Sequence, residues 1–148
     1  MKIVINVCFG GFGLSPLALK EYTKLKGKEC YFFNNSYGKP YESIEIENAG
    51  RLGYSAFSVP NPNELLPNKD DEHYNHEEFN KIYSEITIWD GDIDRTDKDL
   101  ITVVELLKDK ANGGFAELKI VDIPDNIEWE IDDYDGSEHI AEIHRTWC

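Results

Sequence analysis

The chain has 148 residues, of which 41% are hydrophobic, and its 15 Lys and Arg stand against 29 Asp and Glu for a formal net charge of -14. A negative field of this size repels polyanions, which disfavours general binding to nucleic acids or to an anionic membrane. The length predicts one folded domain over residues 1–148, and three cysteines without a CxxC pair are typical of a reducing, cytoplasmic compartment.

The chain is expected to open as a strand, a glycine loop and a helix. Residues 2–9 are rich in Ile and Val and predict a buried strand, and this apolar run is too short for a signal peptide or a membrane span. Residues 10–13 include three glycines, so we expect at least one positive φ there. Ser15 as N-cap and Pro16 as first helical residue predict a helix that ends near Gly27.

Short strands joined by a polar connection are predicted in the middle of the chain. Residues 30–33 and 54–59 have strand-like composition, and residues 43–47 alternate between polar and apolar side chains. Residues 60–75, which are rich in proline and acidic residues, predict an exposed connection within the domain.

Apolar spacing predicts two further helices. The first covers residues 77–86 and carries four side chains on one face, namely Phe79, Ile82, Tyr83 and Ile86. Thr96 with Asp99 resembles a capping box and predicts the start of the second helix, which we expect to end near Asn112.

The C-terminal third predicts strands. Residues 115–123 and 129–131 are strand candidates, Asp135 with Gly136 predicts a turn, and residues 139–147 predict a last strand or a short helix. One early βα unit followed by late strands predicts an α+β fold with a mixed or antiparallel sheet and about three helices on one face.

The glycine loop is a candidate anion-binding site. Backbone N–H groups of Gly10, Gly11, Phe12 and Gly13 would lie ahead of a helix N-terminus, and the Phe12 ring would stack on a base. The pattern is neither a Walker A motif nor GxGxxG. A tight turn between strand and helix, in which the glycines serve only the backbone, is the alternative explanation.

A second candidate segment lies at the C-terminus. Arg145 offers a forked donor for phosphate, His144 exchanges protons near neutral pH, and Trp147 offers a flat face for a base. Tyr134 would stack in the same way, and Arg95 would assist with phosphate. We expect this segment to lie close to the glycine loop. The alternative is an ordinary terminal strand whose arginine pairs with a neighbouring carboxylate.

Two other segments resemble metal sites without matching them. Residues 90–94 begin like a calcium loop, but the sixth and twelfth positions hold Arg95 and Ile101 instead of Gly and Glu. His73 and His76 fit no zinc pattern. We therefore expect no metal and no cofactor.

Several short motifs lie near the two ends of the chain. They are MKIVIN and CFGGFGLS at the start, RTD at residues 95–97, and IPD, YDG and HRTW in the last 26 residues. These motifs resemble a group of small uncharacterised proteins encoded by bacteriophages and prophages, with little resemblance over residues 28–89. The resemblance implies a phage gene product that acts in the host cytoplasm, and the small size and acidity of the chain favour a counter-defence factor.

The sequence thus leads to three functional hypotheses. The first is a non-catalytic protein that sequesters a small anionic, nucleotide-like ligand held by the glycine loop and Arg145. The second is an acidic inhibitor that imitates nucleic acid and binds a protein, motivated by the acidic stretches 70–99 and 122–138. The third is a small hydrolase with His144 as general base, oriented by Asp135 or Glu138. Assembly into a homo-oligomer is compatible with each hypothesis.

Overall fold

The computed structural model describes residues 1–34, 40–48 and 53–143. The chain forms two compact units, which are described separately. The first unit consists of Met1–Tyr22 and Asp90–Cys148, and the second of Thr23–Trp89. The expectation of one domain over residues 1–148 stays a prediction.

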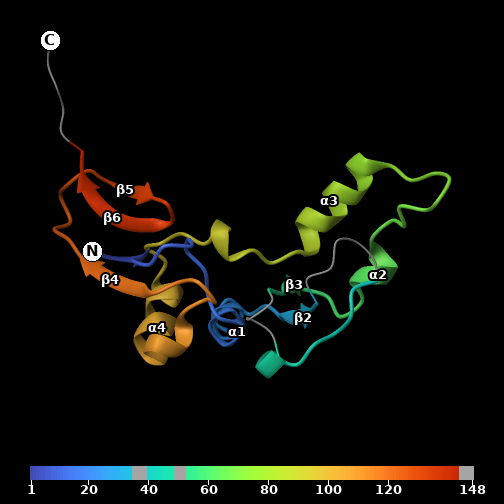
Figure 1. Cartoon of the computed structure of the whole chain (residues 1–148), viewed down its shortest axis with the longest axis horizontal. Helices are drawn as coiled ribbons and strands as arrows, with labels where there is room; N and C mark the ends of the chain where they lie inside the picture. Colours follow the sequence, from blue (N-terminus) through green and yellow to red (C-terminus); the bar gives the residue numbers. More distant parts are fainter. Residues whose placement is uncertain (35–39, 49–52, 144–148) are drawn as a thin grey trace, which may run out of the picture. The chain divides into compact units, whose positions relative to one another are not determined.

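The described residues have an α+β fold, as the sequence predicted. Every strand pair is antiparallel, which is one of the two predicted alternatives, and there are four α-helices instead of about three. None of these helices is both long enough and apolar enough to cross a membrane. The elements in chain order (Figure 1) are β1 (Lys2–Asn6), α1 (Pro16–Leu25), β2 (Tyr31–Phe33), the 3-10 helix η1 (Ile46–Asn48), β3 (Ser55–Phe57), α2 (Pro62–Leu65), α3 (His76–Ile86), η2 (Asp90–Asp92), α4 (Lys98–Leu107), η3 (Lys108–Ala111), β4 (Leu118–Asp122), β5 (Trp129–Tyr134) and β6 (Ser137–Glu142).

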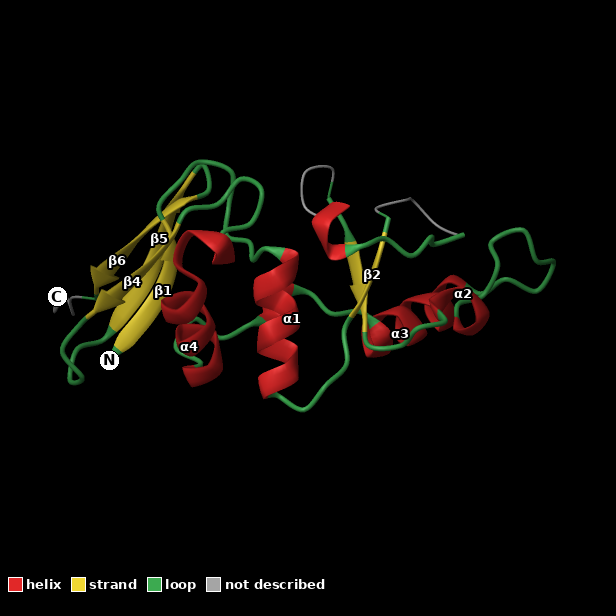
Figure 2. Cartoon of the chain, turned by 90° about the horizontal axis from the view of Figure 1, so that it is seen from below, coloured by secondary structure: helices red, strands yellow, loops and turns green. Residues whose placement is uncertain are grey.

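The first unit has a strand layer and a helix layer. β1 pairs with β4 so that Ile3 lies opposite Val121, and β5 pairs with β6 as a hairpin. Asp135 and Gly136 close this hairpin with φ of 53° and 89°, the positive values that a type I′ turn requires. The predicted turn is therefore confirmed. Within this unit α4 and α1 lie on the same side of the strands (Figure 2).

The core of the first unit forms around β1. Burial of this strand is nearly complete on both faces, which confirms the predicted interior strand. The buried apolar side chains come mainly from β1, α1 and α4; they are Ile3, Val4, Ile5, Leu14, Ala18, Leu19, Leu100, Val103, Val104 and Ala111.

The start of α1 follows the sequence prediction. The Ser15 hydroxyl oxygen accepts from the Ala18 N–H at 3.1 Å, and the same hydroxyl donates to the Lys110 carbonyl at 2.6 Å. Pro16 is the first helical residue, where its missing N–H costs no hydrogen bond. Ser15 therefore caps α1 and also ties it to the end of η3.

The structure corrects three local predictions. Residues 43–47 form no regular strand, because Ser43 makes a single bridge to the short strand β2 and the chain then turns into η1. The N-cap of α4 is Asp97 and not Thr96, since the Thr96 hydroxyl donates to Asp94 at 2.6 Å and is held in the preceding turn. The connection over residues 60–75 is not wholly exposed, because it contains α2 and the buried Leu66.

The second unit is built on an aromatic core. Phe57 of β3 is fully buried, and its ring makes edge contacts with Phe33, Tyr41 and Tyr83 at centroid distances of 5.6, 5.0 and 5.8 Å. The four apolar side chains predicted on one face of α3 all belong to this cluster or pack against it, which confirms that helix face. The apolar residues of the cluster are Tyr31, Phe33, Tyr41, Phe57, Val59, Leu66, Phe79, Ile82, Tyr83 and Ile86.

We expect Phe57→Ala to lower the free energy of unfolding by about 3–5 kcal/mol, because it removes a buried ring and leaves a cavity among three other rings. Urea denaturation followed by circular dichroism measures the change. Trp89→Ala is the control, since Trp89 is 63% exposed and its loss should change stability by less than about 1 kcal/mol. Equal effects of the two substitutions would contradict the assignment of Phe57 to the core.

Candidate functional site

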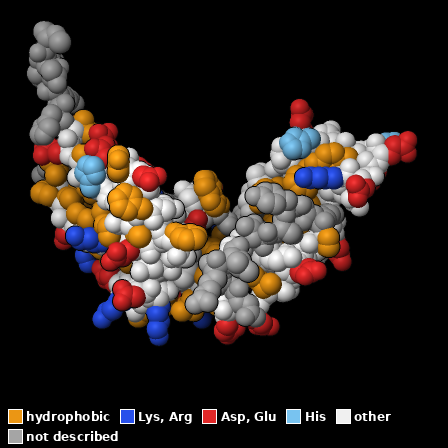
Figure 3. Space-filling view, viewed as in Figure 1, with side chains coloured by type: hydrophobic (Ala, Val, Ile, Leu, Met, Phe, Trp, Pro, Cys, Tyr) orange, Lys and Arg blue, Asp and Glu red, His pale blue; other side chains and the backbone are white. Residues whose placement is uncertain are grey.

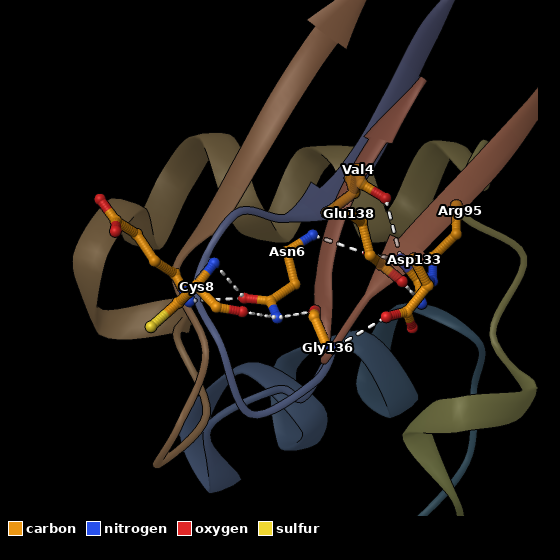
Figure 4. A network of polar contacts seen from close by, with 8 residues as sticks. Val4, Asn6, Cys8, Arg95, Asp133, Gly136 and Glu138 are labelled. Atoms are coloured by element: carbon orange, nitrogen blue, oxygen red, sulfur yellow. Dashed lines mark hydrogen bonds and ion pairs between the residues drawn. The ribbon is translucent and has the colours of Figure 1, made fainter. Parts of the chain in front are cut away.

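Asn6, the last residue of β1, is the most constrained polar side chain of the first unit. It is fully buried, and its amide group makes four hydrogen bonds (Figure 4). Oδ1 accepts from the N–H groups of Cys8 at 3.2 Å and Glu117 at 2.9 Å, while Nδ2 donates to the carbonyls of Cys8 and Gly136, both at 2.7 Å. One asparagine thus joins the end of β1, the approach to β4 and the turn between β5 and β6.

Arg95 and Glu138 form a nearly buried ion pair beside β1. Their two N–O contacts measure 2.7 and 3.1 Å, and the side chains are 19% and 7% exposed. Glu138 also accepts from the Asn6 N–H at 2.8 Å. Arg95 donates from its guanidinium to the Val4 carbonyl at 3.3 Å and accepts from the Val4 N–H through its own carbonyl at 2.9 Å. The pair therefore satisfies backbone groups on the edge of β1 that faces away from β4.

The guanidinium of Arg95 also stacks on Phe12. Its central carbon lies 3.5 Å from the centroid of the half-buried ring. The structure thus brings together two of the residues predicted to bind a ligand, but it pairs them with each other. One face of Phe12 is covered by Arg95, and two oxygens of Glu138 occupy the forked donors of Arg95.

The glycine loop joins β1 to α1 through two residues with positive φ. Gly10 has a φ of 126° and Gly11 a φ of 97°, which confirms the prediction. Both values lie in a region that side-chain-bearing residues rarely adopt. The loop is therefore restricted to glycine at these positions for backbone reasons alone.

Close packing of backbone against backbone is a second reason for glycine in this region. A Cβ on Gly10 would lie 2.7 Å from the Cβ of Phe115, and one on Gly136 would lie 2.7 Å from the nitrogen of Gly10. A Cβ on Gly113 would lie 2.8 Å from the carbonyl group of Gly13. The loop is thus enclosed by the turn between β5 and β6 and by the segment before β4.

A carboxylate of the chain itself lies at the helix end of the loop. Asp90 Oδ2 accepts from the Leu14 N–H at 2.9 Å, and burial raises the pKa of Asp90 above its ordinary value. The N–H groups of Gly11, Phe12 and Gly13 have no hydrogen-bond partner among the described residues. Part of the predicted anion site is therefore filled internally, while three of its N–H groups have no partner among the described residues.

The electrostatic surroundings of the loop are negative. The three segments that meet there, residues 7–13, 113–117 and 132–138, contain no Lys or Arg. They contain five carboxylates, which belong to Glu117, Asp132, Asp133, Asp135 and Glu138. Since Arg95 is already neutralised by Glu138, a phosphate group would meet net repulsion here.

The structure brings together most of the predicted site residues that it describes. Gly10, Gly11, Phe12 and Gly13 lie with Arg95 in the first unit, and Tyr134 is 76% exposed at the end of β5, beside the turn that packs on the loop. The other three predicted residues, His144, Arg145 and Trp147, lie outside the described residues. Within the described part of the chain no group of three or more His, Cys, Asp or Glu is placed to hold a metal ion.

Sequence reasoning missed Asn6 and Asp90 as members of this site, and it named Glu138 only as a residue that would orient His144, not as the partner of Arg95. A signal existed for Asn6, because a lone amide inside an otherwise apolar strand must find partners when the strand is buried. No local pattern indicated Glu138, since its partner Arg95 is 43 positions away in the chain.

Comparison of the chain with protein-family models, curated proteins and solved structures found no match. Any functional conclusion therefore depends on the geometry and charge of the site.

We expect Arg95→Ala to destabilise the protein by about 3 kcal/mol, because it leaves the buried Glu138 carboxylate without its counter-ion. Glu138→Ala should have a similar effect, and the double variant should lose less than the sum of the two. Unfolding in urea gives all three values. The control is Lys2→Ala, which breaks the exposed Lys2–Glu105 pair and should cost less than about 1 kcal/mol. If the double variant lost as much stability as the two single variants together, this would contradict an energetic coupling between Arg95 and Glu138.

The raised pKa of Asp90 predicts a pH-dependent stability. The folded protein holds the Asp90 proton more tightly than the unfolded chain, so this contribution is complete below the unfolded pKa, near 3.8, and is lost as the pH rises through the raised folded value. Asp90→Asn keeps an acceptor for the Leu14 N–H and cannot ionise. The melting temperature of the variant relative to the original chain should therefore rise as the pH increases from about 3 to about 6. A constant difference across this range would contradict the assignment.

Proposed function

We propose that this chain is a non-catalytic binding protein whose partner is a protein with a basic surface. The observation that carries the proposal is the state of Arg95, whose guanidinium stacks on Phe12 of the glycine loop. Three of its five N–H donors are engaged by Glu138 and Val4, and one face of the guanidinium is covered by Phe12. Glu138 neutralises Arg95, and the segments around the loop carry carboxylates. This balance of charge favours a cationic partner over an anionic one.

The energetics of the ion pair support the same choice. A phosphate group could use the two N–H groups that now bind Glu138 only by displacing this carboxylate, which is 7% exposed and would lose its counter-ion. Removing one partner of a buried pair costs about 3–5 kcal/mol, which would consume much of the affinity of a small ligand.

The net charge and the resemblance indicate a class of partner. A charge of -14 gives long-range attraction to basic proteins, among which nucleic-acid-binding proteins are the most strongly charged. The resemblance to small phage proteins is in keeping with a target in the host cytoplasm and with a counter-defence role. Inhibition of this kind requires affinity and no chemistry on the target.

Sequestration of a nucleotide-like anion is the second candidate, and one observation favours it. The N–H groups of Gly11, Phe12 and Gly13 have no partner among the described residues, and they adjoin the Arg95–Phe12 stack. A ligand held there would use these amides, with the second face of Phe12 for a base.

Surface-based binding assays separate the two candidates. The immobilised chain should bind purified basic nucleic-acid-binding domains, duplex DNA should displace them, and the affinity should fall at least tenfold, on the order expected for several charge contacts, as salt rises from about 50 to about 200 mM. Neutral proteins of similar size are the control. In parallel, native mass spectrometry after incubation with nucleotides tests sequestration. A retained nucleotide without binding to basic domains would overturn the proposal in favour of the second candidate.

A further inference from the structure

Three large aromatic side chains remain exposed where the segments of the first unit meet. Phe9 is 63% exposed, Phe115 75% and Tyr134 76%. We refer to these three residues as the aromatic tip. On the visible face of the molecule, hydrophobic, acidic and basic side chains lie interspersed over this unit (Figure 3). Exposed rings grouped in one region are a common feature of interaction surfaces, whereas single exposed apolar residues are not.

The backbones that carry the aromatic tip converge on Gly10. Phe9 precedes Gly10 in the chain, and the Cβ of Phe115 lies so close to Gly10 that no side chain fits between them. Tyr134 precedes Asp135, whose carbonyl accepts from the Gly10 N–H at 3.4 Å. The three rings therefore project from one junction of the fold.

This junction is held rigidly before any partner binds. Asn6 hydrogen-bonds to the segments on both sides of it, at Glu117 and Gly136, and the Asp133 side chain accepts from the Gly136 N–H at 2.7 Å. A surface that is ordered in advance loses little conformational entropy on binding, which favours affinity.

Three carboxylates lie within two sequence positions of residues of the aromatic tip, and their charge indicates the class of partner. Asp133 and Asp135 flank Tyr134 in the sequence, and Glu117 follows Phe115 by two positions. Among the described residues, none of these three carboxylates forms an ion pair with Lys or Arg. Aromatic faces near carboxylates that no Lys or Arg neutralises fit guanidinium and ammonium groups, which gain both cation–π and ionic contacts. A second copy of this acidic chain would instead be repelled.

We infer that the aromatic tip is the docking surface for an Arg- and Lys-rich segment of a partner protein. This inference rests on the proposed function and specifies where the partner binds and by what chemistry. The chain contains an internal example of the contact, because Arg95 stacks on Phe12 at 3.5 Å in the adjoining loop. Phe9, Phe115 and Tyr134 would receive the partner's side chains in the same way, with Asp135 and Glu117 supplying the ionic contacts.

The test uses a fluorescein-labelled oligoarginine peptide and fluorescence anisotropy with the full chain. Phe9→Ala, Phe115→Ala and Tyr134→Ala should each weaken binding about twofold to fivefold, and the double Phe9→Ala, Phe115→Ala variant about tenfold. Leu106→Ala is the matched control, because Leu106 is 71% exposed on α4 of the same unit and its loss should leave binding unchanged. Glu117→Gln should weaken binding and flatten the salt dependence more than Glu85→Gln, an equal change of charge in the second unit.

The outcomes separate this inference from the proposed function. If the original chain binds basic domains but the tip variants bind the peptide as well as Leu106→Ala does, the attraction is spread over the acidic surface, and the inference fails while the proposed function stands. If the original chain binds neither the basic domains nor the oligoarginine peptide, the proposed function and this inference are both overturned. Thermal melts should be the same for all the tip variants, because the altered side chains are exposed. Loss of binding in a variant that melts normally therefore supports the inference.

Discussion

The ion pair between Arg95 and Glu138 is the interaction on which the first unit depends most. Among the strands of the described residues, β1 is paired with β4 alone, along one of its edges. On the other edge, Arg95 and Glu138 supply the carbonyl, carboxylate and guanidinium that pair with Val4 and Asn6. The two residues thus replace part of a missing strand, through the Arg95 carbonyl and both side chains, and the side chains neutralise each other while doing so. Their positions in turn fix the ring of Phe12, which lies against the guanidinium.

Asn6 extends this arrangement to the glycine loop. Because its four hydrogen bonds reach both Glu117 and Gly136, the segments around the loop approach so closely that only glycine fits at several contacts. The segments that approach here also carry Phe9, Phe115 and Tyr134, whose side chains are exposed to solvent. The buried polar network and the exposed aromatic residues are therefore two results of one packing arrangement.

Local rules predicted those parts of the fold that depend on near neighbours in sequence. The Ser15-Pro16 helix start, the Asp135-Gly136 turn and the apolar face of α3 each follow from a few adjacent residues. The cap of α4 was misplaced because two local hydrogen bonds compete for Thr96, and the one to Asp94 prevails. The role of Arg95 was beyond such rules, since the sequence shows an unpaired arginine and only the fold brings Glu138 to it. For the same reason the candidate site could be located at the glycine loop from the sequence, whereas its charge balance could not.

The edge of β1 that is closed by side chains has a consequence for solubility. An uncovered strand edge offers free N–H and C=O groups to strands of other molecules and so promotes aggregation. Here an incoming strand would have to displace the Arg95–Glu138 pair before it could hydrogen-bond to Val4 or Asn6. An Ile- and Val-rich segment at the start of a chain is thereby protected from misassembly by two charged residues that face inward, without the addition of another strand to the sheet.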